Sequence, residues 1–355
     1  MARYWVGGTG NWSDDTNHWA TASGGTPGTG NLPTASDDVI FDSASSASSY
    51  TVTIVTTQAF CNNLTWGNPA SGNPTFAGST SLNISGSASF PSGMTATFSS
   101  AINFLSTGAG TLATNGVQFA CTISNNGIGG SFSLLDDLIM TGASLINPAA
   151  GTFNTNNHNI TTRRLICGNQ TKTMNLGSSV ITIYGSLTNS ITSVASGTTF
   201  NAGTSTFILN DTTPTNKSFD GGGQTFHNFE ISGSGTGNFQ ILGSNIFNDF
   251  KIDTPPNTVL FTAGTTNTFT TFTVSGTAGN LITIGSVTAA THTLAKAGGG
   301  TISSDYLSVS ESIATPGTTW YAGTHSMDGG SNLGWVFTAP PAPAKTFDSL
   351  LLAGD

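Results

Sequence analysis

Three stretches of this chain repeat one pattern of apolar residues: QTFHNFEI (residues 224–231), NIFNDFKI (residues 245–252) and NTFTTFTV (residues 267–274). In each stretch the shared apolar residues occupy positions i, i+3 and i+5. The step from i+3 to i+5 has the two-residue period of a β-strand, which sends both side chains to one face. We therefore expect nine residues to form stacked columns in a core. They are Phe226, Phe229 and Ile231, then Phe247, Phe250 and Ile252, and finally Phe269, Phe272 and Val274.

A unit of about 20 to 25 residues is too short to bury a core alone and must stack on its neighbours. Helical repeats are excluded because Gly and β-branched residues fill the units and a 3.6-residue period is missing. The repeat predicts an all-β protein, a parallel β-solenoid whose turns are about 4.8 Å apart, with distinct capping segments at both ends. The alternative is a pair of tandem β-sandwiches, which also contain short strands at regular spacing.

Weaker copies of the spacing occur outside the three stretches. They are Cys61, Leu64 and Trp66; Leu135, Leu138 and Met140; Thr162, Leu165 and Cys167; and Leu307 with Val309.

Charged residues make up only 7% of the chain, against about 25% in an ordinary soluble domain. The net charge is −9 with eight Lys plus Arg, and Arg163 and Arg164 are the only adjacent basic pair. A nucleic-acid partner would need a basic stripe, so we expect none. No apolar run reaches the 18 or so residues of a membrane span, so we expect no membrane insertion.

The N-terminal sequence MARYWVGGTGNW reaches glycine before a signal-peptide core could form. We therefore expect synthesis in the cytoplasm without Sec export. Cys61, Cys121 and Cys167 lie in apolar contexts without close spacing, which predicts buried free thiols in a reducing compartment.

The open ends of a solenoid must be covered, and both ends of this chain are rich in tryptophan. We predict an N-terminal cap or attachment segment over residues 1–45, solenoid turns over 46–312, a C-terminal cap over 313–338, and a Pro-rich linker with an apolar peptide over 339–355. The predicted cap and packing residues are Trp5, Trp12, Trp19, Trp320 and Trp335. Leu350, Leu351 and Leu352 form either a candidate docking peptide or a frayed tail.

The acidic residues are the candidates for chemistry, because a glycosidase needs two carboxylates roughly 5 to 10 Å apart. Asp136 and Asp137 are adjacent, and one of them could form a turn-to-turn ion pair with Arg164. Asp37, Asp38 and Asp42 could bind calcium or form a turn before the strand DVIF.

Acid pairs in Ser-, Thr- and Gly-rich turns are usually solvated turn formers. The five histidines lack zinc-site spacing. We therefore assign no catalytic, cofactor-binding or metal-binding residue and expect a protein that is not an enzyme.

Four motifs, WVGGTGNWSDDTNHW (5–19), PTASDDVIFD (33–42), QTFHNFEISG (224–233) and DGGSNLGWVF (328–337), carry a resemblance. The chain resembles the repetitive β-helical virion proteins of tailed bacteriophages, which are related in pattern to exported adhesin-like repeat proteins of bacteria. Both ends and several repeats share the resemblance, which transfers no catalytic residue.

The resemblance implies a structural, non-enzymatic virion protein displayed on the particle surface, as a tail fibre or spike component or as a head decoration or head fibre. Its implied partners are other virion proteins, copies of itself in a homo-oligomer such as a trimer, and host surface glycans. The absent signal peptide favours a virion protein assembled in the host cytoplasm. The alternatives are a polysaccharide-depolymerising tailspike and a bacterial surface adhesin.

Overall fold

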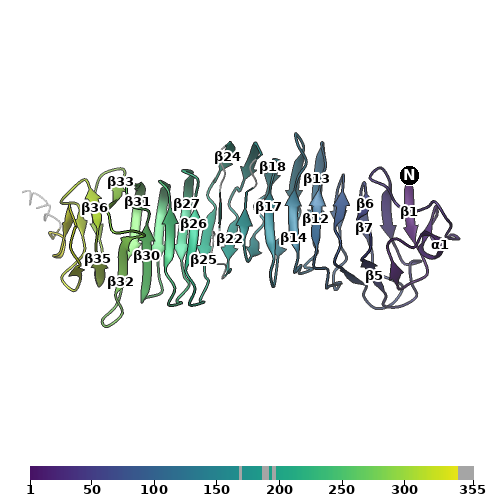
Figure 1. Ribbon diagram of the computed structural model, residues 1–355, viewed down its shortest axis with the longest axis horizontal. Coiled ribbons are helices and arrows are strands. Elements are labelled where there is room, and N and C mark those ends of the chain that lie inside the picture. The colour runs from purple at the N-terminus through teal and green to yellow at the C-terminus, as the bar shows by residue number, and fades with distance from the viewer. Residues whose placement is uncertain (168–169, 186–191, 194–196, 343–355) are drawn as a thin grey trace, which may run out of the picture.

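The structure, a computed structural model, describes residues 1–167, 170–185, 192–193 and 197–342. The strands wind into one parallel β-solenoid of about 13 turns, seen from the side as a rod (Figure 1). The predicted fold is therefore confirmed and the tandem β-sandwiches are wrong. Strands β1 (Ala2–Trp5) and β3 (Trp19–Ala20) pair antiparallel, whereas the other paired strands of the described residues run parallel.

Three walls surround the core through most of the rod. Wall A is a ten-stranded sheet and wall C is a thirteen-stranded sheet. Wall A consists, along the rod, of β3, β1, β4 (Asp38–Phe41), β7 (Leu64–Trp66), β10 (Ala88–Ser89), β13 (Ala109–Ala113), β15 (Ser131–Leu134), β18 (Gly151–Asn154), β21 (Lys172–Asn175) and β24 (Thr198–Asn201). Wall C consists of β6 (Ala59–Cys61), β9 (Leu82–Ile84), β12 (Ala101–Phe104), β14 (Thr122–Asn125), β17 (Leu145–Pro148), β20 (Leu165–Ile166), β23 (Thr192–Ser193), β26 (Lys217–Asp220), β28 (Phe239–Leu242), β30 (Asn257–Phe261), β32 (Ile282–Ser286), β35 (Leu307–Val309) and β38 (Met327–Asp328).

In the turns that have strands in both walls, wall B follows wall A along the chain, and wall B consists of two sheets, of four and nine strands. The first contains β2 (Gly10–Asn11), β5 (Thr51–Ile54), β8 (Thr75–Gly78) and β11 (Thr95–Ala96). The second contains β16 (Leu138–Ile139), β19 (Ile160–Thr162), β22 (Val180–Ile183), β25 (Thr206–Leu209), β27 (Thr225–Ile231), β29 (Ile246–Ile252), β31 (Thr266–Val274), β33 (His292–Lys296) and β36 (Ser312–Thr315). A short third sheet near the C-terminal end contains β34 (Ile302–Ser303), β37 (Trp320–Tyr321) and β39 (Trp335–Val336).

The three quoted stretches form β27, β29 and β31 in adjacent positions of wall B. Phe226, Phe247 and Phe269 are partners in one column, and Phe229, Phe250 and Phe272 in the next. Ile231, Ile252 and Val274 form the third column, and all nine side chains are buried. The Phe250 ring stacks on Phe229 at 5.6 Å and on Phe272 at 5.5 Å between ring centroids. Period-two alternation thus places the aromatic side chains directly above one another.

Wall A ends at β24, and the long strands β27, β29 and β31 begin in the next turns. The first long strand contacts the last strand of wall A, because the ring centroid of Phe226 lies 4.9 Å from that of Phe200 in β24. The register between the long strands skips His227 and Asn248, so each strand contains a break between its i and i+3 positions. The first apolar residues of the three stretches, Phe226, Phe247 and Phe269, therefore lie on the long strands, in turns where wall A has no strand.

Most of the weaker copies do not belong to these columns. Leu138 does, because register from turn to turn connects it through Ile160 to Phe229. Met140, two residues further, and Thr162 lie in the column of Ile231 by the same register. Leu135, however, is exposed, and Leu165 belongs to wall C. Leu307 and Val309 also lie in wall C, and Cys61 lies in wall C while Leu64 and Trp66 lie in wall A. The reason is that a two-residue corner between two strands gives the same spacing as a break within one strand.

The outer face of wall A carries a ladder of amides. The Nδ2 of Asn201 donates to Oδ1 of Asn175 at 2.7 Å, and Nδ2 of Asn175 donates to Oδ1 of Asn154 at 2.7 Å. Nδ2 of Asn154 then donates to Oγ of Ser133 at 3.0 Å. Uncharged side chains therefore satisfy one another from turn to turn, which suits a chain with few charges.

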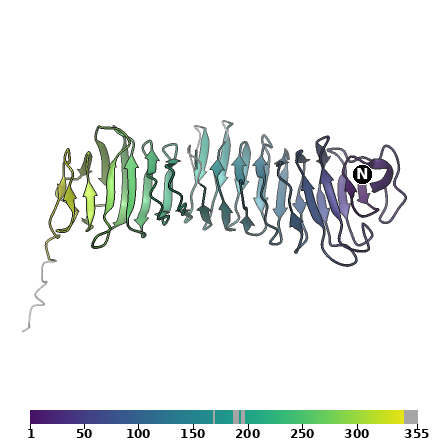
Figure 2. The same ribbon diagram turned by 60° about the horizontal axis from the view of Figure 1, so that its bottom comes forward.

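The two ends of the rod are built differently (Figure 2). At the N-terminal end, residues 1–45 provide β1, β2 and β4 of the first turns, the antiparallel strand β3 and the helix α1 (Asp15–His18). At the other end, residues 313–338 continue the sheets as β36 to β39. Within the described ranges, no helix is long and apolar enough to cross a membrane.

Candidate functional site: a polar network between turns

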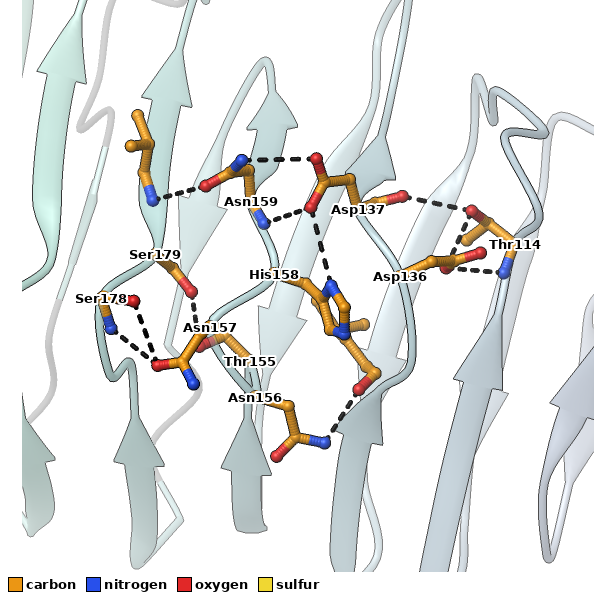
Figure 3. A network of polar contacts seen from close by, with 12 residues as sticks. Thr114, Asp136, Asp137, Thr155, Asn156, Asn157, His158, Asn159, Ser178 and Ser179 are labelled. Carbon is orange, nitrogen blue, oxygen red and sulfur yellow. Dashed lines mark hydrogen bonds and ion pairs between the residues drawn. The ribbon is translucent and has the colours of Figure 1, made fainter.

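The adjacent acids Asp136 and Asp137 lie at the corner between β15 and β16, and they are the centre of a polar network (Figure 3). Oδ1 of Asp136 accepts a hydrogen bond from the backbone N–H of Thr114 at 2.8 Å and lies 3.0 Å from the Thr114 hydroxyl. Oδ2 of Asp136 accepts a hydrogen bond from the backbone N–H of Asn115. Thr114 and Asn115 belong to the preceding turn, so Asp136 joins its own turn to the one before.

Asp137 makes the corresponding contacts to the following turn. Its Oδ1 accepts a hydrogen bond from the backbone N–H of Asn159 at 2.7 Å and lies 3.7 Å from Nδ1 of His158. Oδ1 of Asn159 accepts in turn from the N–H of Val180, at 2.9 Å. Oδ1 of Asn157 likewise accepts from the N–H of Ser178 at 2.9 Å. The network therefore extends over four turns, from the turn of Thr114 to the turn of Ser178 (Figure 3).

A second series of such contacts begins at Asp38 on wall A. Oδ1 of Asp38 accepts from the N–H of Asn63 at 3.2 Å, and Oδ1 of Asn63 accepts from the N–H of Ser87 at 2.9 Å. Oγ of Ser87 then accepts from the N–H of Thr111 at 3.0 Å. In both series a side chain completes the backbone hydrogen bonding of an adjacent turn, which buried or half-buried N–H groups require.

The structure separates the three acids proposed for calcium. Asp37 is buried and faces Arg3 and the N-terminal amine at 3.8 and 3.3 Å. Burial opposes ionisation of Asp37, but hydrogen bonds from Thr34 and the amine, with the Arg3 charge, outweigh it and lower its pKa. Asp38 bonds Asn62 and Asn63, and Asp42 accepts from the N–H of Ala44. Among the residues described here, no three His, Cys, Asp or Glu side chains converge as metal ligands.

The predicted ion pair between Asp136 or Asp137 and Arg164 is wrong. Arg164 lies between β19 and β20, at the corner from wall B to wall C, whereas the two acids lie at the corner from wall A to wall B. Stacking aligns only residues at the same corner. Nε of Arg164 is buried and has no hydrogen-bond partner within the described part of the chain. Burial, followed by the Arg163 charge, lowers the pKa of Arg164.

The N-terminal tryptophans form one buried cluster. Trp5 and Trp12 each contact Trp19 edge to face, with ring centroids 5.0 and 4.9 Å apart. Nε1 of Trp5 donates to the Gly8 carbonyl at 2.7 Å, and Nε1 of Trp19 donates to the Trp12 carbonyl at 2.6 Å. Backbone carbonyls of WVGGTGNW (5–12) thus accept hydrogen bonds from the indoles of Trp5 and Trp19. Strand β3 covers the outer edge of β1.

At the opposite end, Trp320 packs on Phe272 at 5.3 Å and Trp335 packs on Trp320 at 5.2 Å. Beside them lies an apolar hollow of about 540 Å³ whose lining includes Ile313, Gly334 and the largely exposed Leu333. Gly334 has φ of 81°, and a Cβ there would lie 2.1 Å from the Ala314 carbonyl oxygen, so only glycine fits.

Leu350, Leu351 and Leu352, the candidate docking peptide, lie outside the described residues.

Two clusters on the outer surface were missed by sequence reasoning. Nδ1 of His325 lies 2.8 Å from Oδ2 of Asp305, and the His325 ring stacks on Tyr306 at 4.6 Å. On wall B, Nζ of Lys251 lies 3.5 Å from Glu230 and 3.0 Å from Asp253. No local motif predicts them, because His325 meets Asp305, and Lys251 meets Glu230, only through the stacking of neighbouring turns.

Comparison of the chain with protein-family models, with curated proteins and with solved structures gave no match.

Proposed function

We propose that this chain is a structural, non-enzymatic protein of a tailed-bacteriophage particle, displayed on its surface as a tail fibre or spike component or as a head decoration or head fibre. One observation carries the proposal: the acids at the turn corners are engaged with backbone N–H groups of adjacent turns. Such bonds stiffen a rod, and they occupy the carboxylate oxygens that a catalytic acid would offer to substrate.

The different ends of the rod support an attached, protruding protein. At the N-terminal end β3 runs antiparallel on β1, so the parallel stacking of turns cannot continue past it. The C-terminal end carries the apolar hollow beside Trp335. We therefore assign attachment to another virion protein to the C-terminal end and exposure to the N-terminal end. The motifs that carry the resemblance lie at these two ends and in β27.

The experiment is to locate the chain on particles. Antibody fragments against the purified protein, applied to purified phage and imaged by cryo-electron microscopy, should bind rods projecting from tail or head. Mass spectrometry of the same particles should detect the chain at a fixed copy number. A chain missing from washed particles would contradict the proposal.

A depolymerising tailspike is the second candidate, and one observation favours it. Glu230 and Asp249 line a hollow of about 280 Å³ on the outer face of wall B. Asp249 is in register with Asn228, two residues before Glu230 on the parallel strand, so the acids are diagonal neighbours roughly 8 Å apart at the backbone. That spacing is compatible with a glycosidase pair.

The two candidates differ in one assay. Purified protein incubated with host capsule or lipopolysaccharide should release no new reducing ends if it is structural. Release that is lost in both Glu230→Gln and Asp249→Asn, but kept in Asp253→Asn, would instead establish the tailspike.

A further inference from the structure

One part of the rod carries no charge. From Ser43 to Leu135 the sequence contains no Asp, Glu, Lys, Arg or His, although 7% of the whole chain is charged. This neutral segment (residues 43–135) includes the turns from β5 to β15. A net charge of −9 makes copies of the chain repel each other, so the neutral segment is where two copies approach most easily.

Wall A of the neutral segment has a hollowed outer face. Two rows of small side chains, in register from turn to turn, line a hollow of about 400 Å³. The first row is Asn63, Ser87 and Thr111, and the second is Thr65, Ser89 and Ala113. Asp38, at one end, is the single charged residue of the lining.

Exposed aliphatic side chains stand at both edges of this wall. Leu135 follows β15, borders the hollow and is 52% exposed. Ile128 precedes β15 at the other edge and is 73% exposed. The exposed Leu135 and the hollow therefore lie on the same face, where a second molecule could cover the leucine side chain and fill the hollow.

We propose that wall A of the neutral segment packs against the same wall of a second copy of this chain. In a symmetric contact each copy presents the same patch, so the patch must be complementary to itself. A face that carries the exposed Leu135, a hollow and almost no charge meets this requirement, because identical charges would otherwise oppose each other. A partner of opposite charge would find only Asp38 to pair with.

This inference extends the proposed function by placing the contact between copies, but its test uses purified full-length protein and does not depend on any particle. Analytical ultracentrifugation over a range of concentrations should reveal a species heavier than the 36.1 kDa chain. Thr65→Glu places a carboxylate in the middle of the hollow at an exposed position. It should weaken self-association at least about tenfold, as expected for like charges that face each other across an interface.

Thr95→Glu is the matched control. Thr95 is exposed and lies in the neutral segment, but on wall B, so the variant gains the same charge on a different face. It should associate like the unmodified protein. Leu135→Asp should reproduce the effect of Thr65→Glu, and it decides the matter if circular dichroism shows that Thr65→Glu is misfolded. A protein that stays monomeric at all concentrations, or equal weakening by the wall A and wall B variants, overturns the proposal.

Discussion

Asp136 and Asp137 are neighbours in the chain, yet their carboxylates bond opposite neighbours along the rod. Asp136 accepts from the backbone of Thr114 in the preceding turn, and Asp137 accepts from Asn159 in the following turn. Adjacent residues at a β corner point in different directions, so one dipeptide joins three turns (Figure 3). This adjacent acid pair is therefore best explained as a connection between turns.

Asparagine substitution should separate the two connections. Asp136→Asn leaves one acceptor oxygen where two backbone N–H groups donate, and it should lower the free energy of unfolding by about 1–3 kcal/mol. Amide hydrogen exchange should accelerate at Thr114 and Asn115 and stay unchanged at Asn159. Asp137→Asn should show the reverse pattern with a smaller loss of stability, because that side chain is half exposed. Identical exchange patterns in the two variants would contradict the assignment.

The aromatic column should be the most sensitive part of wall B. Phe250→Ala removes a buried ring that stacks on Phe229 and Phe272, and the cavity should cost about 3–5 kcal/mol. The loss should appear as a lower urea midpoint and as faster exchange of amides in β27, β29 and β31. Phe250→Leu keeps most of the volume and serves as the control, with a loss of roughly 1 kcal/mol. Equal stability of the alanine and leucine variants would mean that the column is not tightly packed.

The sequence allowed the stacking of β27, β29 and β31 to be predicted residue by residue, because each strand carries both halves of the pattern. It did not reveal which wall the weaker copies occupy. Cys61 and Leu64 have the same spacing as Phe226 and Phe229, but a corner separates the first pair and a break within a strand separates the second.

The polar contacts were less predictable still. Asp136 is 22 residues from Thr114, and turns of this rod differ in length, so the partner of a side chain depends on every corner between them. The same dependence hid the approach of Lys251 to Glu230, which only the register of β27 and β29 reveals. Local sequence therefore indicates which side chains face outward, whereas the sum of the turn lengths decides what they meet.

The cysteines should be unreactive in the folded protein. All three are buried, and burial raises the pKa of Cys121 and of Cys167 to about 12 and that of Cys61 as well. At pH 8 a protonated, inaccessible thiol is a poor nucleophile. Iodoacetamide should therefore add no label to native protein and three labels after unfolding in urea, as counted by mass spectrometry. Rapid labelling of the native protein would show that the core opens at that position.

Acid should destabilise the rod through His292. Its side chain is fully buried, its ring stacks on Phe261 at 5.0 Å, and its Nδ1 lies 2.8 Å from Oγ of Ser286. Burial lowers the pKa of His292 from 6.5 to about 4. Between these two values the unfolded chain binds a proton that the folded chain does not, so the free energy of unfolding falls as the pH falls. The loss begins near pH 6.5 and is complete near pH 4, and a shift of this size corresponds to roughly 3 kcal/mol.

His292→Gln tests this dependence, since glutamine does not titrate and can still bond Ser286. The variant should be less stable at pH 7, because it loses the ring contact with Phe261, but the difference from the unmodified protein should shrink as the pH is lowered from 7 to 4. Carboxylates also titrate at the acidic end of this range, but they are common to both proteins and cancel in the difference. Urea unfolding of both proteins at half-unit pH steps measures this difference in the free energy of unfolding. A difference that stays constant across the range would show that His292 is already charged in the fold or takes up its proton without opening the core.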